Sequence, residues 1–181
     1  MNAVAPRPRR LDTPRLVLRP LTLADHAAFH DINTIPAVRR YLFDDRVLEA
    51  AESRAMLARS IAQHDDDGLG LFGISLRPVH ARVGWAGYLR HAPGLEIVYA
   101  LLPPYWGRAI AVEACRAVMT WGVRHAGLTE FHSSVDVPNC ASIRVLEKLG
   151  FRETRRTGAL IHFALDASRL DQSNVTCLAA G

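Results

Sequence analysis

The spacing of hydrophobic and polar residues changes several times along the chain, and each change predicts a different element. Residues 15–20 alternate like a short strand, which Pro20 ends because proline has no backbone N–H for a ladder. Thr22, with Asp25 three residues later, predicts a capped helix start. A second helix is expected over residues 48–64, where apolar residues recur one turn apart.

Most of the remaining chain also divides into strand-like and helix-like segments. We expect strands at residues 69–77, 82–90, 95–102, 131–137 and 160–165, and helices at residues 110–126 and 141–149. Gly127 and Gly150 directly follow these two helices and are typical helix ends. The resulting order, β-α-α-β-β-β-α-β-α-β, predicts an α/β (mixed α+β) fold with a mixed central sheet.

The length of 181 residues suits one domain with a well-filled core. We expect a flexible N-terminal tail at residues 1–10, a single domain at residues 11–167 and a C-terminal tail at residues 168–181. No run approaches the ~18 apolar residues that span a bilayer, and the first ten residues lack the apolar segment of a signal peptide. No membrane partner is therefore expected.

The cysteines of the chain, Cys115, Cys140 and Cys177, are widely spaced and form no CxxC pair. Neither a disulfide framework nor a metal site is indicated, and a reducing cytoplasm fits this usage. Nothing in the sequence around Cys115 or Cys140 indicates a lowered pKa, so both are interpreted as structural rather than nucleophilic.

The positive charge is scattered along the chain. The net charge is +4, and Lys148 is the single lysine among 22 lysines and arginines. A nucleic-acid-binding protein more often clusters its cations and interleaves them with aromatic residues. A nucleic-acid partner is therefore not expected, and a basic nucleic-acid-binding module is kept only as a distant alternative.

Two segments have the composition of ligand-binding turns. Residues 101–114 predict a strand, a tight turn and a helix start, where converging backbone N–H groups bind phosphate. Taken alone, this segment is equally typical of an ordinary strand-to-helix loop. Residues 137–151 place Asn139 at a helix start, where its side chain either caps the helix or reaches a ligand.

Three segments, in this order, resemble the GNAT superfamily of N-acetyltransferases, and within it the branch of ribosomal-protein N-terminal acetyltransferases. They are LDTPRLVLRPLTLAD at residues 11–25, YWGRAIAVEA at residues 105–114 and NCASIRVLEKLGF at residues 139–151. The resemblance implies the GNAT fold, a mixed central sheet of about six to seven strands flanked by about four helices, with a splayed parallel strand pair that binds the coenzyme. It also implies transfer of an acetyl group from acetyl-CoA to a primary amine, by direct attack in a ternary complex and without a metal.

The resemblance further assigns coenzyme-binding positions. They are Tyr99, Ala100 and Leu101 on the strand beside the pantetheine arm, Gly107, Arg108, Ala109, Ile110, Ala111 and Val112 at the pyrophosphate turn, and Asn139 and Ser142 near the sulfur and pantetheine. One position departs from the family, because Ala109 stands where glycine is usual. If its backbone φ is positive, the alanine costs about 1 kcal/mol; if the family glycine serves only for close approach, the methyl group instead crowds the pyrophosphate. Coenzyme affinity is the property that this substitution affects.

The reaction requires a base, because an amine near neutral pH is mostly protonated. Glu96 is the leading candidate as a carboxylate in an otherwise apolar strand, although a solvated strand-end carboxylate reads the same way. Asp136 is the second candidate and is equally typical of a turn residue. Ser142 is a candidate to protonate the thiolate, and His132 and His162 are weaker candidates for the base.

A catalytically degenerate domain that binds acyl-CoA as a sensor or scaffold is the main alternative, motivated by Ala109 and by the open identity of the base. The acceptor is a small amine or a protein N-terminus, and the sequence contains no code that distinguishes them. A homodimer is left open.

Overall fold

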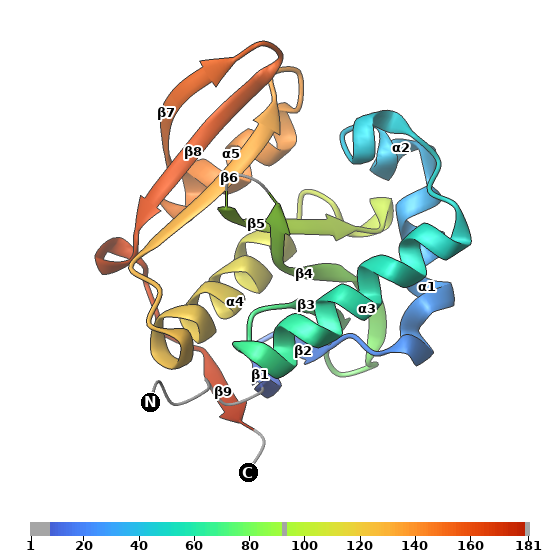
Figure 1. Ribbon diagram of the computed structural model, residues 1–181. Coiled ribbons are helices and arrows are strands. Elements are labelled where there is room, and N and C mark those ends of the chain that lie inside the picture. Colours follow the sequence, from blue (N-terminus) through green and yellow to red (C-terminus); the bar gives the residue numbers. More distant parts are fainter. Residues whose placement is uncertain (1–7, 92–93, 180–181) are drawn as a thin grey trace.

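Two β-sheets and the helices packed against them make up the part of the protein that the computed structural model describes, residues 8–91 and 94–179 (Figure 1). The strands are β1 (Pro8–Asp12), β2 (Leu16–Pro20), β3 (Leu71–Leu76), β4 (Ala81–His91), β5 (Gly94–Leu101), β6 (Glu130–Asp136), β7 (Arg152–Thr157), β8 (Leu160–Asp166) and β9 (Thr176–Ala179). The α-helices are α1 (His26–Thr34), α2 (Pro36–Arg39), α3 (Ala50–Asp66), α4 (Ile110–Ala126) and α5 (Cys140–Leu149). The 3-10 helices are η1 (Leu23–Asp25), η2 (Phe43–Asp45), η3 (Pro103–Tyr105) and η4 (Ala167–Arg169).

The larger sheet has the order β5-β4-β3-β2-β1-β9, and the smaller sheet has the order β6-β8-β7, with antiparallel ladders in both. The predicted mixed α/β fold is confirmed. The strands are divided between two sheets rather than gathered in one, because β5 pairs with β4 and β6 pairs with β8. Within the described residues no ladder joins β5 to β6, and Figure 1 shows the small sheet standing beside the large one at this junction.

Both expected tails contain a strand, so their predicted boundaries need correction. The end of the predicted N-terminal tail belongs to β1, and the predicted C-terminal tail contains β9. These two strands pair with each other, with Leu11 opposite Cys177 and Asp12 opposite Thr176. Local patterning did not reveal β9 because its pairing partner lies at the other end of the chain. Residues 1–7 of the predicted N-terminal tail lie outside the described residues.

Strand β7 was also not predicted from the sequence. Its residues, RETRRT, are all exposed and carry no alternation of apolar and polar side chains. The strand forms because it pairs along β8, for example with Thr157 opposite Leu160. Such a strand is specified by its partner and not by its own hydrophobic pattern.

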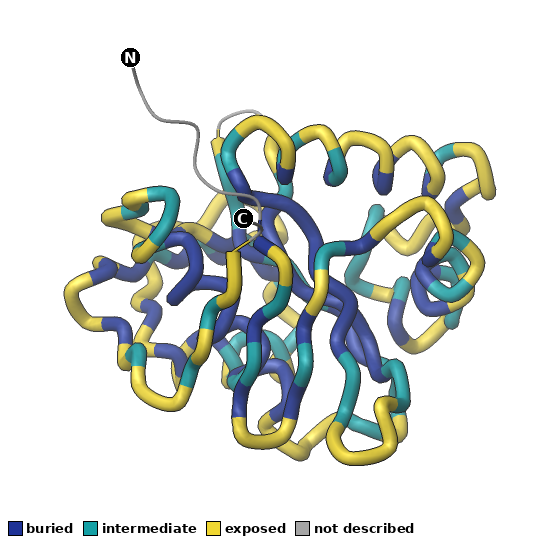
Figure 2. The backbone as a smooth tube through the Cα atoms, turned by 90° about the horizontal axis from the view of Figure 1, so that it is seen from below, coloured by how far each residue is buried: buried dark blue, intermediate teal, exposed yellow. Residues whose placement is uncertain are grey.

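Buried side chains cover both faces of the larger sheet, and Figure 2 shows the buried strand segments at the centre with exposed loops around them. On β5, Ile97 and Leu101 belong to the cluster that includes α4, whereas Ala100 belongs to the cluster that includes α1 and α3. The period-two alternation of β5 therefore directs neighbouring residues to opposite sides of the sheet. Full burial of a large apolar side chain contributes about 1.5–3 kcal/mol to stability, so both faces of the sheet contribute.

Helix α4 is fixed against the sheet by close packing. The Tyr88 hydroxyl donates a hydrogen bond to the carbonyl of Val118 at 3.1 Å. A Cβ atom at Gly122 would lie 2.4 Å from the Tyr88 hydroxyl oxygen, so this position requires glycine for close approach. This packing holds the second half of α4 against β4. Among the described residues, no helix is both long enough and apolar enough to cross a membrane.

Candidate functional site

Strands β5 and β6 meet at the junction of the two sheets, where side chains connect them. Ser133 Oγ donates to the carbonyl oxygen of Ile97 at 3.1 Å, and Ser134 Oγ donates to Glu96 Oε1 at 2.6 Å. In Figure 1 the arrows of the two strands point toward the same side of the view and separate toward their tips. The edge of β5 that faces away from β4 pairs with no strand within the described residues, and Tyr99 and Leu101 lie on this last part of the strand. Such an edge accepts an extended ligand through backbone hydrogen bonds.

The turn between β5 and α4 has two residues in the left-handed backbone region. Gly107 has φ +73°, and Ala109 has φ 58° and ψ 17°. A Cβ at Gly107 would meet nothing within 4 Å, so the dihedral angle, and not space, favours glycine there. Ala109 is an L-residue in the same region, which costs about 1–2 kcal/mol. The condition set by the sequence, a positive φ at Ala109, is met.

Backbone groups are the available ligand contacts at the start of α4. The side chains of Ile110, Ala111 and Val112 are buried in the core, whereas Arg108 and Ala109 are exposed. The N–H groups of the first helical residues have no acceptor within the helix. They lie at the positive end of a 17-residue helix, where an anion is stabilised.

A polar clamp that the sequence did not assign to the site holds this turn against the β1–β2 connection. Glu113, in the first turn of α4, accepts hydrogen bonds from Thr13 Oγ1 at 2.6 Å and from Arg15 Nε at 2.6 Å. Arg15 also donates to the carbonyl oxygen of Arg108 at 3.0 Å. The only sequence signal for the clamp was that its residues fall in two of the three segments that carry the family resemblance.

The start of α5 contains the two remaining predicted coenzyme contacts, Asn139 and Ser142. Asn139 Oδ1 accepts from the backbone N–H of Ser142 at 3.2 Å, so its side chain caps the helix. The Tyr99 hydroxyl is buried and makes no hydrogen bond of ordinary geometry within the described residues. Burial raises the pKa of the Tyr99 phenol well above its usual range, as does nearby Cys115, while Ser142 opposes the shift. A buried polar atom of this kind is one that a bound ligand satisfies.

The cysteines near the site differ in exposure. Cys115 is fully buried on α4, and burial raises the pKa of its thiol well above the usual range. A thiol in that state is inert, in agreement with the structural role predicted for it. Cys140 is exposed at the first position of α5.

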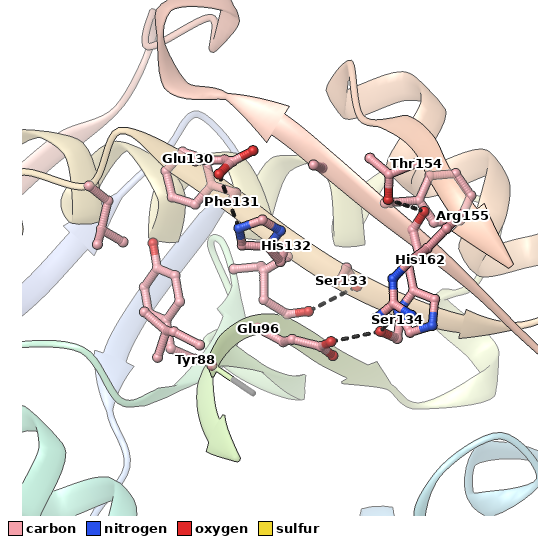
Figure 3. A pocket seen from close by; sticks show the side chains of 16 residues that line it. Tyr88, Glu96, Glu130, Phe131, His132, Ser133, Ser134, Thr154, Arg155 and His162 are labelled. Atoms are coloured by element: carbon pink, nitrogen blue, oxygen red, sulfur yellow. Dashed lines mark hydrogen bonds and ion pairs between the residues drawn. The ribbon is translucent and has the colours of Figure 1, made fainter. Parts of the chain in front are cut away.

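Glu96 lies near the start of β5, at a cavity of about 610 Å³ between the two sheets (Figure 3). Its carboxylate accepts the Ser134 hydroxyl, and Ser134 Oγ lies 3.0 Å from His162 Nδ1 on β8. The cavity is also lined by His132, whose Nε2 lies 3.3 Å from Glu130 Oε2. The structure thus places two carboxylates and two imidazoles around one cavity.

The other predicted site residues lie elsewhere. Asp136 is half-buried at the end of β6, and its carbonyl accepts the backbone N–H of Asn139 at 2.8 Å, as in a turn. It does not line the cavity that contains Glu96. None of the predicted coenzyme-turn residues, 107–112, lines this cavity either. In the described ranges, no group of three or more His, Cys, Asp or Glu side chains is placed to hold a metal.

Comparison with known proteins shows which family the chain is similar to. The family model described as "Acetyltransferase (GNAT) domain" matches residues 15–152. The chain is 29% identical over 147 residues to an uncharacterised N-acetyltransferase, YoaA, of Bacillus subtilis (strain 168), covering 79% of this chain and 82% of that protein.

Two solved structures have the same fold. One is RimJ of Mycobacterium smegmatis, determined with CoA-disulfide, with a TM-score of 0.74, 21% identity, and coverage of 95% of this chain and 94% of that one. Another is RimL, a ribosomal L7/L12 α-N-protein acetyltransferase in complex with coenzyme A, with a TM-score of 0.71, 19% identity, and coverage of 85% and 95%. The fold, the strand-to-helix turn and the match over residues 15–152 agree, and the chain belongs to the GNAT family of acetyltransferases.

Proposed function

We propose that the protein transfers the acetyl group of acetyl-CoA to a primary amine, by direct attack of the amine in a ternary complex. The observation that carries this proposal is the position of Glu96. Its carboxylate lies near the start of β5, at a cavity of about 610 Å³, and the same strand leads at its other end toward the turn before α4. An acceptor bound at the cavity and a coenzyme bound at the turn meet along this strand.

The residues on the coenzyme side fit a pyrophosphate and a pantetheine arm. Gly107 and Ala109 turn the chain so that the first N–H groups of α4 are exposed to an anion. The edge of β5 that joins no ladder within the described residues and the buried Tyr99 hydroxyl supply hydrogen-bonding groups farther along the groove. Asn139 and Ser142 border it from α5.

On the acceptor side, Glu96 accepts the proton that the amine loses as its nitrogen attacks the thioester carbon. The carbon–sulfur bond then breaks, and the thiolate that leaves takes a proton from solvent, either directly or relayed through the Ser142 hydroxyl. Glu96 then releases its proton to solvent, so no covalent enzyme intermediate forms. Asp136 is the second candidate for the base and lies outside the cavity.

For the acceptor we propose the α-amino group of a peptide, with small primary amines as the competing class. The resemblance to the ribosomal-protein branch and the likeness of the fold to RimL and RimJ support a peptide N-terminus. A degenerate domain that binds acyl-CoA without catalysis is the alternative, motivated by the left-handed backbone at Ala109 and by the open identity of the base. A homodimer and a cytoplasmic location remain predictions from the sequence.

The test is release of coenzyme A thiol by the purified full chain with acetyl-CoA and a panel of peptides and small amines. Glu96→Gln should lower kcat by about 10² or more, the usual range for loss of a general base. The loss should shrink as pH rises, because free amine then forms without help from the enzyme. Acetyl-CoA affinity should barely change, since the expected coenzyme contacts are backbone groups farther along β5.

Asp136→Asn provides the matched carboxylate-to-amide comparison, with a small effect expected from a residue that shapes a turn. A collapse of kcat in Asp136→Asn with normal turnover in Glu96→Gln would transfer the role of base to β6. Tight acetyl-CoA binding without thiol release on any amine would support the degenerate alternative.

A further inference from the structure

Three side chains from three strands form a continuous hydrogen-bonded chain that ends on Glu96. Ser134 on β6 and His162 on β8 are directly opposite each other in the ladder, so their side chains lie on the same face of the small sheet. Ser134 Oγ lies 3.0 Å from His162 Nδ1 and 2.6 Å from Glu96 Oε1. Figure 3 shows the three groups side by side at the cavity wall.

The count of hydrogens in this chain determines the direction of each bond. A serine hydroxyl has one hydrogen, and Ser134 donates it to the Glu96 carboxylate. His162 Nδ1 must then carry a hydrogen and donate it to Ser134 Oγ. The other ring nitrogen, Nε2, is buried and has no hydrogen-bond partner among the described residues. A lone pair is tolerated there better than an N–H group, which agrees with a hydrogen on Nδ1.

We propose that Ser134 and His162 are positioning residues that hold the Glu96 carboxylate in place as the base toward the acceptor amine. This inference rests on the proposed function. A glutamate side chain on a strand has three rotatable bonds, and a short hydrogen bond to one of its oxygens restricts them. The chain also ties Glu96, on the large sheet, to the small sheet across a junction where no ladder exists within the described residues. The position of the base is thereby coupled to the distance between β5 and β6, the two strands between which we expect the coenzyme to bind.

Kinetics of variants in the chain test the proposal. Ser134→Ala should lower kcat about tenfold, the size expected for losing a hydrogen bond to a charged group, and leave the KM for acetyl-CoA within about twofold. In a Glu96→Gln background the same change should cost less than about twofold, because the carboxylate that it positions is already absent. Ser75→Ala, which removes a serine hydroxyl from β3 of the large sheet, is the matched control and should keep wild-type kcat.

Variants of the histidine distinguish a hydrogen-bond donor from a packed ring. His162→Leu should lower kcat about as much as Ser134→Ala. His162→Asn keeps an amide N–H near the position of Nδ1 and should restore most of the activity. Equal loss in both variants, or full activity in His162→Leu, would overturn the role of the Nδ1 donor.

A second measurement needs no turnover. Nitrogen-15 spectra of the histidine rings at pH about 8, where imidazoles are neutral, should show His162 as the Nδ1–H tautomer, and Ser134→Ala should shift it toward Nε2–H. An Nε2–H tautomer in the wild type would refute the chain. A wild type inactive on every amine would refute the proposed function, and with it the catalytic role of the chain. An active wild type in which the losses from Ser134→Ala and Glu96→Gln are additive would refute the positioning role alone.

Discussion

Replacing Ala109 by glycine should stabilise the protein slightly and should maintain or improve its affinity for acetyl-CoA. Ala109 has φ 58° and ψ 17°, so its Cβ lies close to the following carbonyl group, as in any L-residue with left-handed backbone. Glycine removes this contact at the turn that is expected to hold the pyrophosphate. The position is exposed, so the methyl group contributes little to the core.

The magnitude follows from two opposing contributions. Relief of the left-handed conformation gains about 1–2 kcal/mol. The greater backbone freedom that glycine has when unfolded costs about 0.5–1 kcal/mol. The free energy of unfolding should therefore rise by up to about 1.5 kcal/mol, which corresponds to an increase in Tm of up to about 3–6 °C for a chain of this length.

Two glycine-to-alanine changes provide matched controls. Gly107 and Gly127 have φ +73° and +66°, and a Cβ at either position would meet nothing within 4 Å. Both Gly107→Ala and Gly127→Ala should therefore lower the free energy of unfolding by about 0.5–1 kcal/mol, through backbone strain alone. Only Gly107→Ala should weaken acetyl-CoA binding, because Gly127 lies at the opposite end of α4.

Thermal melts and calorimetric titration with acetyl-CoA measure both quantities. A lower Tm for Ala109→Gly would show that the methyl group stabilises the turn. A tenfold loss of affinity in this variant, about 1.4 kcal/mol, would show that the methyl group packs usefully against the coenzyme. Either result would refute the assignment of Ala109 as a strained position that lowers affinity.

The remaining predictions concern the ion pairs of two carboxylates outside the cavity, Glu113 and Asp25. Arg15→Gln removes the 2.6 Å pair with Glu113 that holds the coenzyme turn, so calorimetry should find acetyl-CoA binding about 3–10-fold weaker, and unchanged affinity would exclude a role for this clamp. Burial would raise the pKa of Asp25, but hydrogen bonds led by that from Arg19 hold it well below its usual range. Its stabilising effect is therefore present above about pH 4, the unfolded value, and is lost as pH falls below it. Asp25→Asn should lower the free energy of unfolding by about 2–3 kcal/mol at pH 7, since Arg19 and Arg82 lose their partner. Urea unfolding of both proteins at a series of pH values should show this difference narrowing below pH ~4. A difference that stays constant with pH would contradict the linkage between the ionisation of Asp25 and stability.

The sequence by itself determined the elements whose boundaries depend on neighbouring residues. Helix α4 begins and ends where the sequence predicted, at Ile110 and Ala126, because its apolar face and the following Gly127 are local signals. Asn139 was predicted as a cap and caps α5 for the same reason. The left-handed backbone of the turn could also be anticipated from the sequence. Ala109 stands where the family usually has glycine, and glycine is typical of residues with a positive φ.

The tertiary structure alone decided which distant residues meet. Strands β1 and β9 pair across almost the whole chain, and β7 forms only because β8 offers it an edge. Glu96, Ser134 and His162 come from strands in two sheets. The sequence marked Glu96 as a candidate base and His162 as a weaker one, but it gave no sign that Ser134 connects them. Their contact depends on the register of β6 with β8 and on the approach of β6 to β5. Register is set by long-range packing, and a slip of one residue would direct the Ser134 side chain to the opposite face of the sheet.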